Sequence, residues 1–159
     1  MMRDYARAPR GERVEYRTPR NRGCVLTMIG AISIDGIETI RTVEGGTTGA
    51  VFLAFVRNDL LPCLAPGDVV VMDNLGAHHA TGVRALIESV GASVLYMPPY
   101  SPDLNPIELA WSKLKSVLKK IGARTKTTIR AAVDVAARSI TTSDSLGWFA
   151  HVLESTQRE

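Results

Sequence analysis

Two acidic residues of this chain follow predicted strands, which is a common position for catalytic side chains. Asp73 directly follows the short apolar run Val69–Met72, and Glu108 begins a predicted helix after a second such run, Ser93–Met97. In α/β sheets, functional groups collect at the carboxyl ends of strands, where neighbouring strand-to-helix units open into one cleft. Two carboxylates that share a cleft repel each other unless a hard cation neutralises them, and Mg²⁺ binds a few carboxylate oxygens together with water and substrate phosphate. The pair is therefore suited to metal-assisted phosphoryl transfer.

Each acid also has a purely structural interpretation. An Asp-Asn pair after a strand, here Asp73-Asn74, commonly forms a turn. Asn105 is a natural helix N-cap, Pro106 suits the first helical position, and Glu108 stands where the glutamate of a capping box lies. The residues alone leave both interpretations open.

The elements that must position these acids begin with a predicted β-hairpin. Two β-branched runs, Cys24–Ile34 and Ile37–Val43, flank Asp35-Gly36. The apolar spacing of Thr48–Leu61 then predicts a helix, with Pro62 as its stop.

The second half of the chain alternates strands and helices. We expect Asp68–Met72 to form a strand buried on both faces and Ser93–Met97 to form another. Helices are predicted over the ranges His79–Ser89, Pro106–Ile121 and Thr127–Ile140, and Trp148-Phe149 is expected to pack back onto the body. This order predicts an α/β fold with a mixed sheet flanked by helices.

Composition excludes several classes of protein. Hydrophobic residues make up 45% and charged residues 22% of the 159 residues, as in soluble globular domains. No apolar run reaches the roughly 18 residues of a membrane helix, and Met1–Arg7 lacks the apolar core of a signal peptide. Two isolated cysteines, Cys24 and Cys63, are too few for a disulfide framework and are expected in the core. A reduced, cytoplasmic compartment is therefore the expectation.

Basic charge is concentrated in two stretches, although the net charge is only +3. Residues 1–22 hold seven arginines against three acids, and residues 109–130 hold seven basic residues and no acid. Such clustering is typical of proteins that bind a phosphate backbone, although solvated helix faces also show it. The candidate DNA-binding residues are Lys113, Lys115, Lys119, Lys120, Arg20 and Arg22.

Two stretches resemble a known family. Residues 69–78 read VVVMDNLGAH, and residues 96–108 read YMPPYSPDLNPIE. Together, with 34 residues between Asp73 and Glu108, they closely resemble the DDE transposases of the Tc/mariner superfamily, most of all its bacterial insertion-sequence branch. The resemblance extends over nearly the whole chain.

The resemblance implies a ribonuclease-H-like fold that binds two Mg²⁺ or Mn²⁺ ions and cuts and rejoins DNA. It implies that Asp73 and Glu108 are catalytic metal ligands, with Asn74, His78 and Asn105 as supporting residues. His78 is not expected to bind the metal itself, because Mg²⁺ prefers oxygen.

One part of the family pattern has no match. The family's first catalytic aspartate lies near the end of a first, central strand, and neither Asp4 nor Asp35 matches that position. We therefore expect an arginine-rich arm over residues 1–22 and, over residues 23–159, an N-terminally truncated ribonuclease-H-like DDE endonuclease domain without its first central strand. No helix-turn-helix region is expected in this chain either.

The main hypothesis is a transposase catalytic domain whose partners are transposon-end and target DNA, with a homodimer as a further expectation and a bacterial, nucleoid-associated location. The alternative is a catalytically dead, truncated remnant that only binds DNA or oligomerises. A metal-dependent phosphatase on small substrates would leave both basic stretches unexplained. No membrane partner is expected.

Overall fold

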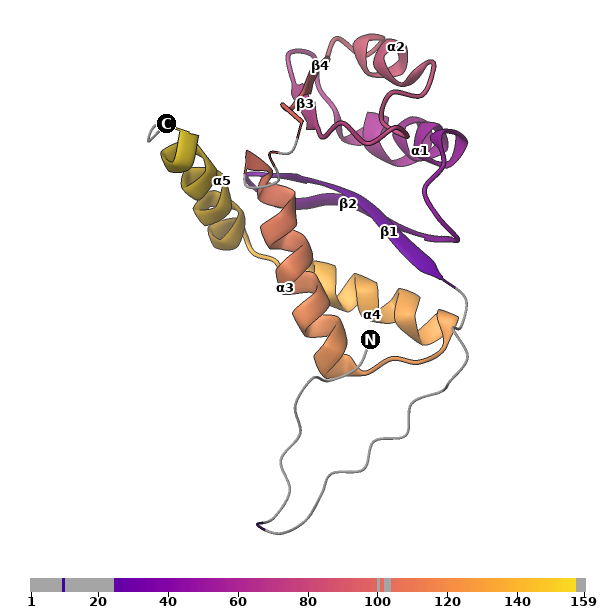
Figure 1. Cartoon of the computed structure of the whole chain (residues 1–159), viewed down its shortest axis with the longest axis vertical. Helices are drawn as coiled ribbons and strands as arrows, with labels where there is room; N and C mark the ends of the chain where they lie inside the picture. The colour runs from indigo at the N-terminus through magenta and orange to yellow at the C-terminus, as the bar shows by residue number, and fades with distance from the viewer. Residues whose placement is uncertain (1–9, 11–24, 100, 102–103, 157–159) are drawn as a thin grey trace.

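The computed structural model describes residues 10, 25–99, 101 and 104–156. The predicted arm over residues 1–22, with Arg20 and Arg22, therefore lies outside the described residues apart from position 10, as does Cys24. The elements alternate as predicted, and they form two small sheets with helices around them (Figure 1).

The predicted hairpin is confirmed. Strands β1 (Leu26–Ser33) and β2 (Gly36–Glu44) pair antiparallel, with Leu26 opposite Glu44. A register shift lies between Ala31 and Ile32. Gly36 has a φ of 136°, a backbone conformation that side-chain-bearing residues rarely adopt, so it suits the turn.

The helix predicted after the hairpin changes type along its length. α1 (Gly49–Phe55) begins at Thr48, whose side chain accepts a hydrogen bond from the Val51 amide. It continues as a π-helix, η1 (Val56–Leu60), and ends in a 3₁₀ turn, η2 (Leu61–Cys63). Pro62 stands at the start of that final turn rather than after the helix, because a proline is tolerated where no helical N–H is needed.

Cys63, predicted in the core, is exposed. The short turn after Pro62 places it at the surface, where its Sγ lies 3.3 Å from the Asp59 carbonyl oxygen. Partial burial, with the nearby charges of Glu38 and Asp59, raises the pKa of this thiol.

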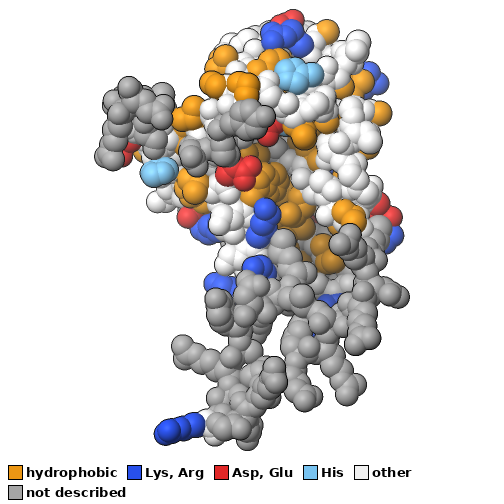
Figure 2. Space-filling model, in the orientation of Figure 1, with side chains coloured by type: hydrophobic (Ala, Val, Ile, Leu, Met, Phe, Trp, Pro, Cys, Tyr) orange, Lys and Arg blue, Asp and Glu red, His pale blue; other side chains and the backbone are white. Residues whose placement is uncertain are grey.

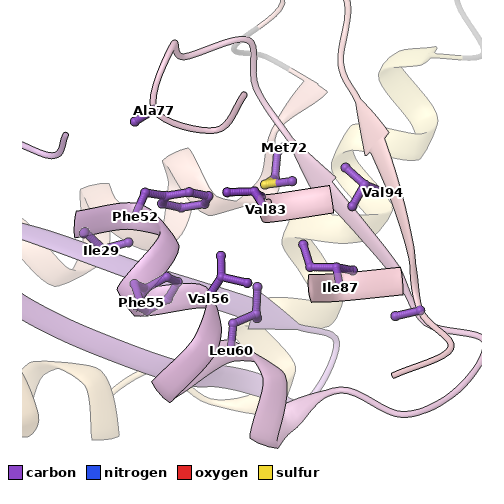
Figure 3. Close-up of a cluster of buried hydrophobic side chains, with 11 residues drawn as sticks. Ile29, Phe52, Phe55, Val56, Leu60, Met72, Ala77, Val83, Ile87 and Val94 are labelled. Atoms are coloured by element: carbon purple, nitrogen blue, oxygen red, sulfur yellow. The ribbon is translucent and has the colours of Figure 1, made fainter. Parts of the chain in front are cut away.

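Strands β3 (Val69–Met72) and β4 (Ser93–Tyr96) pair parallel, with Met72 opposite Tyr96. The prediction that β3 is buried on both faces is wrong, because Val69 and Val71 are 57% and 50% exposed. Met72 and Val94 point into a cluster with Phe52, Val83 and Ile87 (Figure 3). Helices cover this sheet on that face alone among the described residues.

The helix predicted over His79–Ser89 is shorter than expected. α2 runs over Val83–Glu88 and begins after Gly82, which has a φ of 95°. Turns over residues 76–79 and 81–82 precede it instead, so His79 lies outside the helix.

The long helix that carries the first half of the basic stretch is confirmed over its full predicted range, as α3 (Pro106–Ile121). Leu114 and Leu118 are buried on its inner face, whereas Ile121 is 45% exposed because it ends the helix at the left-handed Gly122. Gly30 lets α3 approach the hairpin, since a Cβ there would lie 3.1 Å from the Trp111 ring.

Two further helices pack against α3. α4 (Lys126–Arg138) agrees with the prediction to within two residues, and its capping box uses Thr125 and Thr128. Trp148 packs against the second buried cluster as expected, but it does so from a helix, α5 (Thr142–Thr156), that the sequence did not predict. The hairpin lies between two layers of helices. α1 and η1 pack on one of its faces, and α3 and α4 pack on the other (Figure 1).

The two sheets are separate ladders. In the part of the chain that the structure describes, β1 pairs with β2 and β3 pairs with β4, and no strand joins the pairs. The mixed α/β class with flanking helices is the one that the sequence predicts, but the described strands form two small sheets instead of one mixed sheet. No helix of the described residues is both long and apolar enough to cross a membrane.

Candidate active site

Asp73 lies directly after β3, as predicted, and its carboxylate is held from two sides. Oδ1 accepts a hydrogen bond from the Leu75 amide over 2.9 Å and lies 2.8 Å from Nδ1 of His78. The first contact is the turn that the structural interpretation foresaw, so this aspartate forms a turn and still remains half-exposed. The carboxylate is therefore both fixed in position and accessible.

His78 is oriented by its surroundings. Its ring lies against Phe52, with the ring centroids 4.4 Å apart, and its Nδ1 also lies 3.2 Å from the Asp73 carbonyl oxygen. With a proton on Nδ1, the imidazole donates to Asp73 and steadies the carboxylate. His78 thus contacts Asp73 directly, which the sequence did not foresee.

Asn74 connects the ends of the two parallel strands. Its Nδ2 donates to the Met97 carbonyl oxygen, and its Oδ1 lies 3.1 Å from Nε2 of His79. The Met97 amide in turn donates to the Met72 carbonyl oxygen over 2.8 Å. The carboxyl ends of β3 and β4 are therefore bound together beside Asp73.

Glu108 lies in the first turn of α3 and is exposed. Asn105 is the N-cap, with its Oδ1 accepting from the Ile107 amide over 3.3 Å, and Pro106 takes the first helical position. The Glu108 amide donates to the Asn105 carbonyl oxygen over 3.1 Å. The N-cap is as predicted, and an acid in this turn is favoured by the helix dipole.

The two acids share one topological position. Asp73 follows β3, and Glu108 follows β4 by way of a short connection, so each lies after the carboxyl end of one of two paired parallel strands. No group of three or more acidic, histidine or cysteine side chains among the described residues could hold a metal ion. The donor chemistry fits one hard cation, because Mg²⁺ is often held by one or two carboxylates plus phosphate and water.

The predicted DNA-binding lysines have different surroundings. Lys113 is half-buried and forms an ion pair with Asp144 of α5. The hydrogen bond that Lys113 donates in this ion pair, with two more from Thr141, lowers the pKa of Asp144 to about 2. Lys115 and Lys120 are exposed on α3, and Lys119 is half-buried.

Nearby basic residues also contact acids. Lys126 and Arg130 of α4 lie 2.7 and 3.6 Å from the carboxylate of Glu44. Figure 2 shows lysine and arginine side chains interspersed with acidic ones on one face of the molecule.

A family model described as "DDE superfamily endonuclease" matches residues 1–130. The chain belongs to the DDE endonuclease superfamily. No curated protein sequence matches it.

Solved structures of the Mos1 mariner transposase share the fold of this DDE-superfamily chain. A pre-cleavage Mos1 transpososome matches with a TM-score of 0.72 and 14% identity, covering 99% of this chain and 50% of that one. The Mos1 mariner paired-end complex with Mn matches with a TM-score of 0.75 and 18% identity, covering 94% and 47%. The Mos1 catalytic domain matches with a TM-score of 0.63 and 15% identity, covering 82% and 76%.

This DDE-superfamily chain spans about half the length of the Mos1 chains in the transpososome and the paired-end complex. The shared fold is ribonuclease-H-like, as the sequence predicts, and the matched structures are complexes of a transposase with transposon ends or its catalytic domain.

Sequence reasoning did not foresee the contact between three residues near this site, namely His79, Tyr96 and Arg84. The His79 ring stacks on Tyr96, and the Arg84 guanidinium lies over the same Tyr96 ring. Nothing in their spacing along the chain predicts this contact, because they come from a turn, a strand and a helix that meet only in the fold.

Proposed function

We propose that this chain is the catalytic portion of a DNA transposase, acting on transposon ends and target DNA by metal-dependent phosphodiester cleavage and strand transfer. The observation that carries the proposal is the placement of Asp73 and Glu108 after two paired parallel strands, in a chain of the DDE endonuclease superfamily. We assign it to the bacterial insertion-sequence branch on the motif over residues 96–108, which implies a bacterial cytoplasm and contact with the nucleoid.

Asp73 and Glu108 are the proposed catalytic ligands of Mg²⁺ or Mn²⁺. A pair of such ions, when bound, supplies an activated attacking oxygen and stabilises the leaving one. The chain's own contribution is positional. His78 and the Leu75 amide hold Oδ1 of Asp73 while half of this side chain stays exposed, and Asn105 starts the helix that carries Glu108.

DNA binding is assigned to the exposed positions of α3, chiefly Lys115 and Lys120, together with Lys119. Lys113 stays a candidate, but its ion pair with Asp144 competes with a phosphate contact. Arg20 and Arg22 of the arm over residues 1–22 are proposed to add phosphate contacts to the domain over residues 23–159. A homodimer, which would bring two DNA ends together, is part of the same proposal.

A second candidate function is a non-catalytic DNA-binding remnant of such a transposase. Two observations favour it. The described residues offer two candidate ligand acids rather than three, and no strand joins the two sheets in the described part of the chain. Two ions need ligands that hold both in register, which two carboxylates supply poorly.

The test of the shared site uses Mn²⁺ as a paramagnetic probe in nuclear magnetic resonance of the labelled full chain. If Asp73 and Glu108 bind one ion, low Mn²⁺ concentrations broaden the amide signals of Leu75 and Ile107 together. Asp73→Asn and Glu108→Gln should each abolish the broadening at both amides. Broadening of one amide alone, or broadening that survives either substitution, would show that the acids do not share a metal.

A cleavage assay then separates the two candidate functions. The same chain is incubated with a supercoiled plasmid and Mn²⁺. Nicking that Asp73→Asn removes supports the catalytic portion, whereas Mn²⁺ binding and DNA binding without nicking support the remnant.

A further inference from the structure

A stack of three side chains lies beside Asp73 and has no role in the proposed metal site. The rings of His79 and Tyr96 are 4.2 Å apart between centroids, with planes 25° from parallel. The guanidinium carbon of Arg84 lies 5.5 Å from the centroid of the same Tyr96 ring, in the range of a cation–π contact. The stack therefore joins the turn after β3, strand β4 and helix α2.

The stack is held in one orientation. The Tyr96 hydroxyl donates to the His78 carbonyl oxygen over 3.1 Å, so this ring is fixed at its far end. Nδ2 of Asn74 donates to the Met97 carbonyl oxygen. Oδ1 of Asn74 therefore faces His79 and accepts a hydrogen bond from its Nε2. Hydrogen bonding and stacking together stop the His79 ring from rotating freely.

The stack is also accessible. His79 is exposed, and the Arg84 side chain is 52% exposed. Arg84 contacts Glu88 one helical turn away at 3.3 Å, but an ion pair between two half-exposed side chains is weak and leaves the guanidinium able to bind phosphate. A fixed, exposed ring with a cation close by is the arrangement that proteins use to bind single nucleotides of a strand.

The location relates the stack to the proposed reaction. His79 bonds to Asn74, which directly follows Asp73 in the chain, so one side chain separates the ring from the candidate metal ligand. A DNA strand with a phosphate at Asp73 has its neighbouring nucleotide only about 3.4 Å further along the duplex axis. That nucleotide therefore falls within reach of His79.

We propose that His79, backed by Tyr96, stacks on a base of the DNA strand next to the phosphate that faces Asp73, and that Arg84 binds an adjacent phosphate. The inference rests on the proposed function for its DNA substrate, but it concerns binding and needs no metal. A base must be unpaired to lie flat on a ring, so the site fits a frayed or single-stranded DNA end rather than intact duplex.

The experiment measures binding of the full chain, in EDTA, to a fluorescent duplex with a short unpaired 3′ overhang and to its blunt-ended counterpart. His79→Ala should weaken binding to the overhang DNA about tenfold. It should leave binding to the blunt duplex nearly unchanged. His79→Phe, which keeps a flat ring without the nitrogen atoms, should restore most of the affinity. An overhang that carries 5-iododeoxyuridine should photocross-link to residue 79 in the unsubstituted chain.

Matched variants test the role of Arg84. Arg84→Gln should lower the slope of log Kd against log salt by about 0.7, the value for one phosphate of a single strand. Arg138→Gln removes the same charge from α4, and Glu88→Gln removes the acidic neighbour of Arg84, so neither should weaken binding. Thermal unfolding by circular dichroism checks that each variant folds.

The outcomes separate the two proposals. If folded His79→Ala and Arg84→Gln bind the overhang as tightly as the unsubstituted chain, while Lys115→Ala weakens binding, the stack is not a DNA site and the proposed function stands. If His79→Gln restores affinity and His79→Phe does not, hydrogen bonding replaces stacking and the inference is wrong. If the unsubstituted chain binds neither DNA, the proposed function fails together with the inference.

Discussion

The side-chain amide of Asn74 donates to the backbone carbonyl of Met97, and this bond ties the residue after Asp73 to the residue after β4. It sets the spacing between the carboxyl ends of the two parallel strands, where the candidate site lies. The other end of the same amide accepts from His79. One side chain therefore links the proposed metal site, the strand pair and the proposed DNA-stacking residue.

Replacement of Asn74 by alanine should destabilise the fold by about 1 kcal/mol, because the Met97 carbonyl loses its side-chain donor. Urea unfolding followed by circular dichroism measures the change. Asn58→Ala is the matched control, since Asn58 is exposed on η1 and its loss should stay within about 0.5 kcal/mol. Equal effects of the two variants would count against a structural role for the Asn74 bond.

Gly30→Ala should destabilise the chain by about 1–3 kcal/mol, in the range of overpacked cores. A Cβ at this position would lie 2.9 Å from the Thr39 carbonyl oxygen and 3.1 Å from the Trp111 ring, and the Thr39 backbone cannot move without distorting the hairpin. The measurement is the thermal unfolding midpoint. Gly46→Ala is the control, because no atom lies within 4 Å of a Cβ there. An unchanged midpoint for Gly30→Ala would contradict the close packing of α3 on β1.

Asp144 should make stability depend on pH in the acid range. Its pKa falls from 3.8 to about 2 in the folded chain, chiefly through the hydrogen bond from Lys113. A lowered folded pKa means that the stabilisation is complete above the unfolded value and is lost as the pH falls from about 4 towards 2. Asp144→Asn should remove this part of the acid dependence, as measured by urea midpoints at several pH values. A variant whose acid profile matches that of the unsubstituted chain would exclude the ion pair as its source.

Lysines on α3 should differ in their effect on DNA binding. Lys115→Ala should reduce the slope of log Kd against log salt by about 1, because an exposed lysine that contacts phosphate releases counterions. Lys113→Ala should instead lower the stability of the chain, since Lys113 is engaged by Asp144 between α3 and α5. Fluorescence anisotropy over a range of salt concentrations measures the first effect, and urea unfolding measures the second. A larger salt effect for Lys113→Ala than for Lys115→Ala would reverse the assignment.

The remnant alternative predicts that the chain of residues 1–159 shows no strand cleavage or joining by itself. The described residues contain no group of three or more acidic, histidine or cysteine side chains that could hold a metal ion, and Asp73 and Glu108 alone are too few ligands to hold two ions firmly. A transposon-end duplex with Mn²⁺ is the substrate, and Asp73→Ala is the control. Cleavage by the unsubstituted chain that disappears in the control would overturn this expectation.

The sequence by itself was enough for the features that depend on local chemistry. The hairpin at Asp35-Gly36, the N-cap at Asn105 and the 16-residue helix α3 follow from turn residues, capping residues and apolar spacing that act over a few positions. The placement of Asp73 at a strand end follows from the same local pattern, and the family follows from the motifs around Asp73 and Glu108.

Only the tertiary structure decided which surfaces and side chains meet. β3 reads as a fully buried strand, yet Val69 and Val71 are exposed, because burial depends on which helices cover the sheet and not on the strand's own residues. The helix expected from His79 begins only at Val83, because Gly82 takes a left-handed conformation. The contacts of His79 with Tyr96 and of Lys113 with Asp144 join residues on different elements. Long-range contacts of this kind leave no periodic signal in a sequence, since they arise only when elements that are far apart in the chain pack together.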